Sequence, residues 1–165
     1  MTGDMLQGSG AALVTLYRDN RLELIRLALL LVGDRETAED IVQDVFARLH
    51  GRRPDVLTLA YVRSSVLNGA RSTLRRRRVA LHKPPPAPLP AESAEAAALL
   101  GETRQEVLTA VTRLPARQRE TLVLRYYLDL SDAEIADVTG LRQSTVRSTV
   151  TRALNRLERE LRASG

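Results

Sequence analysis

Five prolines lie close together in the middle of this 165-residue chain, between Pro84 and Pro90. Proline lacks the amide hydrogen that a helix needs, and it disfavours helical backbone in the residue before it. We therefore expect an extended, proline-rich linker over residues 79–101. This linker divides the chain into two small folding units, which are expected over residues 11–78 and 102–165.

The composition favours helices in both units. Aromatic residues make up 3% of the chain, whereas Ala, Leu and Arg, which are good helix formers, dominate. The hydrophobic fraction of 44% is sufficient for packed helices. The expected fold is therefore all-α, with two small helical domains. Residues 1–10 are expected to be disordered, as chain termini often are.

Apolar residues recur at helical spacing throughout the first unit. Three helices are expected, over about Leu13–Val32, Asp34–His50 and Leu57–Arg77, and Gly33 should end the first of them. The inner face of the second helix should be Ala38, Ile41, Val42, Val45, Phe46 and Leu49, and that of the third Leu59, Val62, Val66, Ala70 and Thr73.

The second unit is expected to contain four helices, the first two separated by Leu114-Pro115. Their expected ranges are about Glu102–Arg113, Ala116–Leu128, Asp132–Val138 and Ser144–Arg162. Ser131 and Glu134 have the spacing of a capping box, which would begin the third helix. Gly140 allows the sharp turn between the third and fourth helices, so this pair is predicted to be a helix-turn-helix.

The last helix is predicted to have one apolar side and one side of arginines and short hydroxyls. The apolar stripe should be Val146, Val150, Ala153, Leu154, Leu157 and Leu161. Arginine, serine and threonine suit contacts with phosphates and base edges in a DNA major groove. A plain amphipathic helix with a solvated polar face is the alternative. The predicted DNA-contacting residues are Ser144, Thr145, Arg147, Ser148, Thr151 and Arg152.

The charge of the first unit is divided between two segments. Asp34 to Asp44 contains five acidic residues and one arginine, whereas Arg52 to Lys83 contains nine basic residues and one acid. Two segments of opposite sign indicate two different partners. The net charge of +5 fits an anionic partner, either nucleic acid or a membrane surface, although such a charge also serves solubility.

The third helix combines this basic charge with an aromatic residue at one end, a combination that suits single-stranded DNA. The alternative for Arg75 to Arg78 is a solvated basic run that complements the helix dipole. One side of the helix should hold Tyr61, Arg63, Ser64, Asn68, Arg71, Ser72, Arg75 and Arg78. The predicted contacts are Tyr61, Arg63, Ser64, Asn68, Arg71, Ser72, Arg75 and Arg76.

These segments resemble the extracytoplasmic-function sigma factors of the sigma-70 family, over about residues 13–163. The most specific match is Ala38-Glu39-Asp40-Ile41-Val42-Gln43-Asp44-Val45-Phe46, which resembles the segment that docks on the β′ coiled coil of RNA polymerase. The resemblance implies that the polymerase contacts are Glu39, Asp40, Gln43 and Asp44.

Two further segments carry the resemblance. Ala60 to Arg78 resembles the part of region two that recognises and melts the minus-ten promoter element, with Tyr61 where the family commonly has Trp and Ser72 where it commonly has Asp. Leu114 to Glu120 and the helix-turn-helix resemble region four, which recognises the minus-thirty-five element, with Thr149 where a basic residue is frequent. In the family the linker enters the RNA exit path of the polymerase.

The resemblance implies a sigma factor that directs promoter recognition and transcription initiation. The implied partners are promoter DNA and core RNA polymerase, through the β′ coiled coil and the β flap, and an anti-sigma factor is left open. A stand-alone helix-turn-helix regulator is the alternative, and a protein that sequesters another helical factor is a third reading. The regulator would leave the acidic segment and the Tyr61–Arg78 face unexplained, and the concentrated arginines argue against the sequestering protein.

Other classes are not expected. His50 and His82 have no neighbouring partner at ligand spacing, there is no glycine-rich phosphate loop, and cysteine is absent. No enzymatic activity, cofactor or metal site is therefore predicted. The most apolar run, Leu27–Val32, is far shorter than the ~20 residues of a membrane-spanning helix, and the first residues lack the pattern of a signal peptide. A cytoplasmic location without membrane insertion is expected.

Overall fold

The computed structural model describes residues 2–80 and 105–163 of the chain. These residues form helices joined by short turns, and no strand occurs among them. The prediction of an all-α fold is confirmed. Of the linker expected over residues 79–101, only Val79 and Ala80 are described, and both belong to a helix. The rest of that prediction lies outside the described residues.

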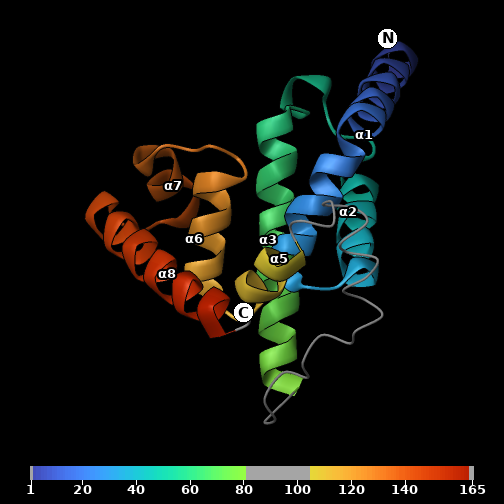
Figure 1. The fold of residues 1–165 in the computed structure, drawn as a ribbon. Coiled ribbons are helices and arrows are strands. Elements are labelled where there is room, and N and C mark those ends of the chain that lie inside the picture. Colours follow the sequence, from blue (N-terminus) through green and yellow to red (C-terminus); the bar gives the residue numbers. More distant parts are fainter. Residues whose placement is uncertain (1, 81–104, 164–165) are drawn as a thin grey trace. The chain divides into compact units, whose positions relative to one another are not determined.

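The described residues belong to two compact units. The first holds residues 2–29 and 35–80, and the second holds residues 30–34 and 105–163. The first unit contains α2 (Arg35–Leu49), α3 (Leu59–Ala80) and all of α1 (Thr2–Val32) except its last three residues. These three helices run in alternating directions (Figure 1). The short 3-10 helix η1 (Pro54–Val56) lies between α2 and α3.

The core of the first unit is formed by one face of each helix. All six residues predicted for the inner face of α2 are buried, which confirms that face. Val62, Val66 and Ala70 of α3 are buried as predicted, while Leu59 and Thr73 are half-buried. From α1 the core receives Leu13, Leu24, Ile25, Leu27, Ala28 and Leu29.

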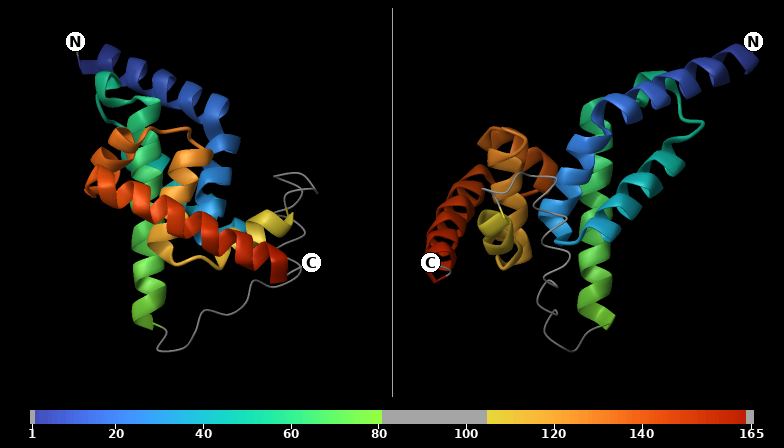
Figure 2. Two further views of the ribbon diagram at one scale, coloured as in Figure 1. Left: turned by 60° about the vertical axis from the view of Figure 1, so that its left-hand side comes forward. Right: turned by 45° about the vertical axis from the view of Figure 1, so that its right-hand side comes forward.

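The structure differs from the prediction at the N-terminal end of α1. The backbone is helical from Thr2 onward, whereas disorder is expected over residues 1–10 and the helix start at Leu13. Extending a helix that already exists needs no new nucleus, because each added residue fixes its own backbone and gains one hydrogen bond. The first turns of α1 extend past the other helices of this unit, and so do the last turns of α3 (Figure 2).

Specific contacts connect the three helices of the first unit. The rings of Tyr17 in α1 and Phe46 in α2 meet edge to face with their centroids 5.1 Å apart, a favourable arrangement for aromatic pairs. Arg77 near the end of α3 donates to Thr37 Oγ1 of α2, over 2.8 Å. Gly69 of α3 lies where α3 approaches Ile41 of α2 closely.

The second unit contains α5 (Gln105–Thr112), α6 (Ala116–Tyr126), α7 (Asp132–Thr139) and α8 (Gln143–Ala163). Leu114-Pro115 separates α5 from α6 as predicted, with Pro115 at the N-cap position of α6. Helix α8 packs against α5, α6 and α7, and it lies across α6 in Figures 1 and 2. The buried residues include Leu108, Val111, Leu114, Leu122, Leu124, Ile135, Val146 and Ala153.

The inner face of α8 is rotated relative to the predicted apolar stripe. Thr149 is 2% exposed and belongs to the core, whereas Leu154, predicted to be buried, is 39% exposed. At about 100° per residue, Leu154 lies about 80° from the fully buried Val146, at the edge of the face. Thr149 lies closer to the centre and is small enough to pack there, and Arg152 donates to its hydroxyl over 3.4 Å. Thr149 therefore belongs to the core of the unit and not to the side of α8 that is predicted to contact DNA.

Within residues 2–80 and 105–163, no helix is both long enough and apolar enough to span a membrane.

Candidate nucleic-acid interface

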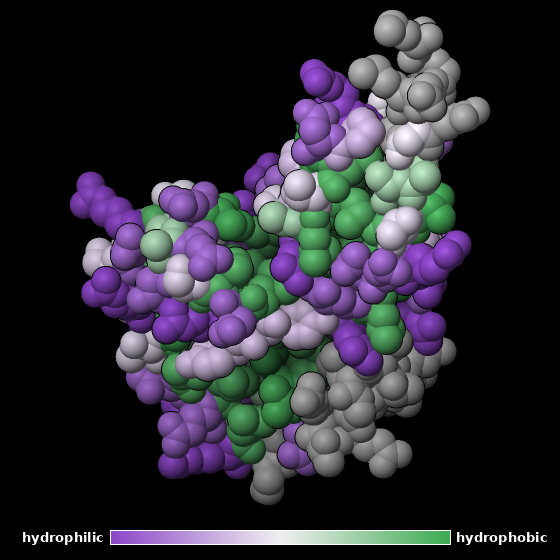
Figure 3. All heavy atoms as spheres, turned by 90° about the horizontal axis from the view of Figure 1, so that it is seen from above, coloured by the Kyte–Doolittle hydropathy of each residue, from purple (hydrophilic) through white to green (hydrophobic). Residues whose placement is uncertain are grey.

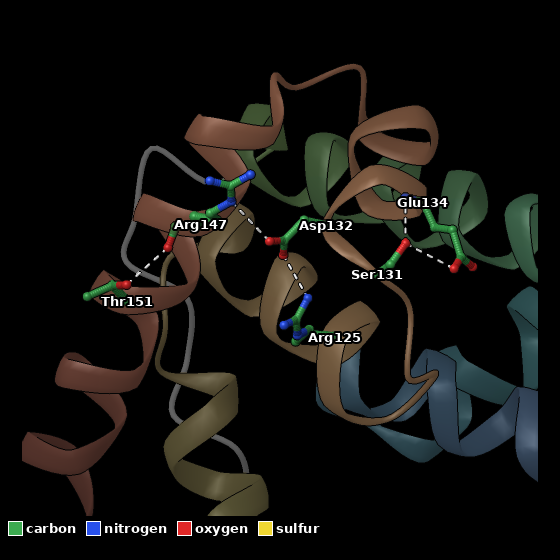
Figure 4. Close-up of polar contacts among 6 residues, drawn as sticks. All are labelled: Arg125, Ser131, Asp132, Glu134, Arg147 and Thr151. Carbon is green, nitrogen blue, oxygen red and sulfur yellow. Dashed lines mark hydrogen bonds and ion pairs between the residues drawn. The ribbon is translucent and has the colours of Figure 1, made fainter.

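Helices α7 and α8 form a helix-turn-helix whose ends are fixed by local hydrogen bonds. The amide of Glu134 donates to Ser131 Oγ over 3.2 Å, as the predicted capping box requires. The hydroxyl of Ser131 in turn donates to the carboxylate of Glu134 over 3.0 Å (Figure 4). Gly140 ends α7 with a left-handed φ of 74°, which glycine adopts without steric cost. Three residues, 140–142, therefore suffice to turn the chain into α8.

The side of α8 predicted to contact DNA is open to solvent. Its exposed members are Ser144, Arg147, Ser148, Thr151 and Arg152, while Thr145 is half-buried. In Figure 3 the left-hand margin, which belongs to the second unit, is predominantly hydrophilic. The structure thus brings five of the six predicted residues onto the surface of one helix.

The hydroxyl groups on this surface are oriented by the helix itself. Ser148 donates to the carbonyl of Thr145, and Thr151 donates to the carbonyl of Arg147, each over 3.0 Å. Each hydroxyl oxygen keeps lone pairs that accept hydrogen bonds, for example from an amino group of a base. Together with the arginines, the surface offers both donors and acceptors, as recognition of base edges requires.

An acidic residue outside the set of predicted contacts lies at the start of α7. The carboxylate of Asp132 binds two arginines from different helices, one with each oxygen (Figure 4). Arg125 Nη1 of α6 lies 2.7 Å from Oδ1, and Arg147 Nε of α8 lies 3.2 Å from Oδ2. Local spacing gives no signal for this cluster, because its members are 7 and 15 residues apart in sequence.

The second group of predicted contacts lies on α3. Asn68, Ser72, Arg75, Arg76 and Arg78 are exposed, Tyr61 is 39% exposed, and Ser64 and Arg71 are half-buried. The last turns of α3, which carry the arginine run, extend past α2 (Figure 1). A protruding basic end and an accessible aromatic ring are suitable for contact with a nucleic-acid strand.

Arg63 is separated from this group, which corrects the expectation that it shares the side of Tyr61. It lies two positions after Tyr61, about 200° around the helix, and it faces α1. There its Nε donates to Glu23 Oε1 over 2.9 Å, and its Nη2 contacts the same oxygen. The guanidinium is therefore engaged inside the unit.

The predicted polymerase contacts lie on the outer side of α2. Asp40, Gln43 and Asp44 are exposed, because the opposite face of the helix is packed in the core. Glu39 is half-buried and pairs with Arg35 over 2.9 Å, while Asp44 pairs with Arg48 over 2.6 Å. Asp40 and Asp44, four residues apart, present their carboxylates on the same side of the helix.

No group of three or more His, Cys, Asp or Glu side chains suited to a metal ion occurs in the described parts of the chain.

Comparison with protein families gives two matches, one in each unit. Residues 16–79 match the family model for Sigma-70 region 2, and residues 104–157 match the model for Sigma-70, region 4. The RNA polymerase sigma-E factor of Streptomyces antibioticus is 32% identical over 161 residues, which cover 95% of this chain and 88% of the relative. The ECF RNA polymerase sigma factor SigM of Mycobacterium tuberculosis is 31% identical over 158 residues, or 93% of this chain and 79% of the relative.

A solved structure is similar in fold. It is the sigma factor RpoE of Bartonella quintana in complex with the anti-sigma factor NepR. The TM-score is 0.63 at 22% sequence identity, and the match covers 90% of this chain and 97% of the other.

Proposed function

Since this chain belongs to the extracytoplasmic-function sigma factors of the sigma-70 family, we propose that its two units divide the recognition of a promoter between them. The chain directs RNA polymerase to promoters and initiates transcription, as its family does. In our proposal the second unit recognises the distal, minus-thirty-five element, and the first recognises and melts the proximal, minus-ten element.

The observation that carries the proposal is the exposed surface of α8 in the helix-turn-helix. Arg147 and Arg152 supply charge and parallel donors, while Ser144, Ser148 and Thr151 supply short polar groups. A helix of this kind fits the major groove, where each base pair presents a distinct set of donors and acceptors. The buried Thr149 packs in the core of the unit and is left out of the proposed interface.

The first unit supports the proposal with two surfaces of opposite charge. The basic end of α3 and Tyr61 suit a separated DNA strand, whose unstacked bases pack on aromatic rings. The exposed acids of α2 would be repelled by DNA, so they suit a protein partner with basic groups. We assign Asp40, Gln43 and Asp44 to core polymerase, with Glu39 at the edge of that surface.

The proposal places the protein in the cytoplasm, where the polymerase works, and gives it no enzymatic step of its own. An anti-sigma partner stays a prediction. The similar sigma factor was solved in complex with the anti-sigma factor NepR, which gives an example of such a partner. The stand-alone regulator gains no support, because the first unit matches region 2 of sigma factors, a part that such a regulator does not need.

Reconstituted transcription tests the proposal directly. Core RNA polymerase is combined with the full chain on a library of genomic fragments, and the 5′ ends of the transcripts are sequenced. The expected result is a set of start sites that share two upstream elements and disappear when the chain is omitted. A reaction without any chain-dependent start site would refute the proposal.

A further inference from the structure

Among the described residues, the carboxylate of Asp132 is the acidic group that contacts the proposed DNA-facing side of α8, through its ion pair with Arg147. We propose that Asp132 is a positioning residue for promoter recognition, an inference that rests on the proposed function. Asp132 fixes the guanidinium of Arg147 so that the two terminal amino groups of that side chain can donate to a single base pair of the distal element.

The atoms used by the ion pair support this role. Asp132 Oδ2 accepts from Nε of Arg147, and within the described residues neither Nη group of Arg147 makes a hydrogen bond. Arginine recognises guanine with two parallel donors that bond to O6 and N7. An arginine held by its Nε keeps the Nη pair for that contact. Arg147 is 67% exposed, so these donors are accessible.

Asp132 is itself held firmly enough to act as an anchor. It is the first residue of α7, directly after the capping residue Ser131, so its backbone is fixed by the cap. Its second oxygen binds Arg125 of α6 over 2.7 Å, and its side chain is only 24% exposed. A long exposed arginine otherwise loses much rotamer freedom on binding, and fixing it beforehand reduces that loss.

The sign of the charge makes the role testable. A carboxylate near DNA repels phosphates, so its removal should strengthen binding that does not depend on sequence. Loss of a positioning residue should at the same time weaken discrimination at the base pair that Arg147 contacts. A merely structural residue would instead change binding to all sequences by a similar factor.

The experiment uses the full chain assembled with core polymerase. Each holoenzyme is mixed with promoter duplexes randomised over the distal element, and bound and unbound fragments are sequenced. Asp132→Asn is the test variant. Asp137→Asn removes the same charge from an exposed position of α7 that has no partner among the described residues, and serves as the matched control.

We expect Asp132→Asn to reduce the preference for the favoured base pair at one position by roughly 3- to 10-fold, with the other positions unchanged. Binding to duplexes without the element should be unchanged or stronger. Asp132→Glu, which keeps the carboxylate, should restore part of the preference, and Asp137→Asn should preserve it fully.

Three results would overturn the inference, and they are distinguishable. If Arg147→Ala alters preference at one position and Asp132→Asn does not, positioning is wrong while the proposed function stands. If Asp132→Asn weakens all positions equally, its role is structural. If Arg147→Ala alters the preference at no position, the proposed use of α8 fails as well.

If Asp132→Asn unfolds in a thermal melt, Arg125→Met replaces it as the test variant, since it releases Oδ1 and leaves Asp132 intact. Unchanged preference in Arg125→Met would then count against the inference.

Discussion

Gly69 of α3 lies where α3 closely approaches Ile41 of α2. A Cβ atom added to this glycine would lie 3.0 Å from Cγ2 of Ile41, which is itself buried in the core of the unit. Such a distance is well below an ordinary contact between carbon atoms. The absence of a side chain at position 69 therefore permits the packing that places the acidic surface of α2.

We predict that Gly69→Ala lowers the free energy of unfolding by about 1 kcal/mol. Alanine gains up to about 1 kcal/mol over glycine inside a helix, but overpacking a core costs about 1–3 kcal/mol. The second effect should win because Ile41 is enclosed. Urea unfolding followed by circular dichroism measures the change.

Two variants serve as controls for Gly69→Ala. In an Ile41→Leu background, which removes Cγ2, the same substitution should be neutral or stabilising. Gly10→Ala should also be neutral or stabilising, because an added Cβ at Gly10 meets no atom within 4 Å. Equal effects of Gly69→Ala in the two backgrounds would show that the close contact with Ile41 is unimportant.

The sequence predicts single residues well where the cause is local. Every member of the inner face of α2 follows from helical spacing, and the Ser131 cap and the Gly140 turn follow from residue type. Asp132 and Arg63 show where such reasoning ends. Their partners lie on other helices, 15 and 40 residues away, so that only the packed fold brings the charges together.

At the scale of elements, the contact between Arg63 and Glu23 ties α3 to α1. Both side chains are half-buried, and the guanidinium gives two hydrogen bonds to one carboxylate oxygen. This geometry orients the first half of α3, and with it Tyr61, relative to α1. Arg63 therefore influences the side of α3 that is proposed to contact DNA by fixing the position of the helix.

We predict that Arg63→Gln and Glu23→Gln each lower the free energy of unfolding by about 1 kcal/mol, since charge-assisted hydrogen bonds are lost in a partly buried place. The double variant should lose less than the sum of the two single losses, with a coupling of roughly 0.5 kcal/mol or more. Urea unfolding of the three variants gives this cycle. Strict additivity would mean that the pair contributes nothing. As a control, Arg53→Gln breaks an exposed pair with Asp55 and should have little effect.

The elements themselves are predicted to within a few residues, apart from the ends of the long helices. Helix α3 continues to Ala80 and α1 begins at Thr2, because helices propagate through residues that lack a strong stop signal. The rotation of α8 is harder to predict from hydropathy. Leucine at position 154 suggests burial, yet α5, α6 and α7 cover the side that holds Thr149. The contacts of α8 with these three helices therefore determine which side of α8 is buried.

At the scale of the whole molecule, the acidic and the basic residues that are predicted to contact partners lie on different helices. The acids of α2 are exposed on one helix of the first unit, while exposed arginines occupy the end of α3 and one side of α8. This division allows one small protein to bind a protein and DNA at the same time. We therefore expect the exposed arginines to take part in promoter binding by the assembled holoenzyme. The acids of α2 should take part in the binding of the chain to core polymerase.

We predict that the double variant Asp40→Arg and Asp44→Arg binds core polymerase at least about tenfold more weakly than the native chain, because it places two like charges against a basic partner surface. The fold should persist, since both side chains are exposed and the inner face of α2 is unchanged. Titration of a fluorescently labelled chain with core polymerase measures the affinity, and circular dichroism verifies the helix content.

The matched control is Asp19→Arg with Asp55→Arg, which makes the same change in charge at exposed positions elsewhere in the first unit and should bind normally. If both double variants lost affinity equally, the effect would be one of net charge. If neither lost affinity, α2 would not be the docking helix.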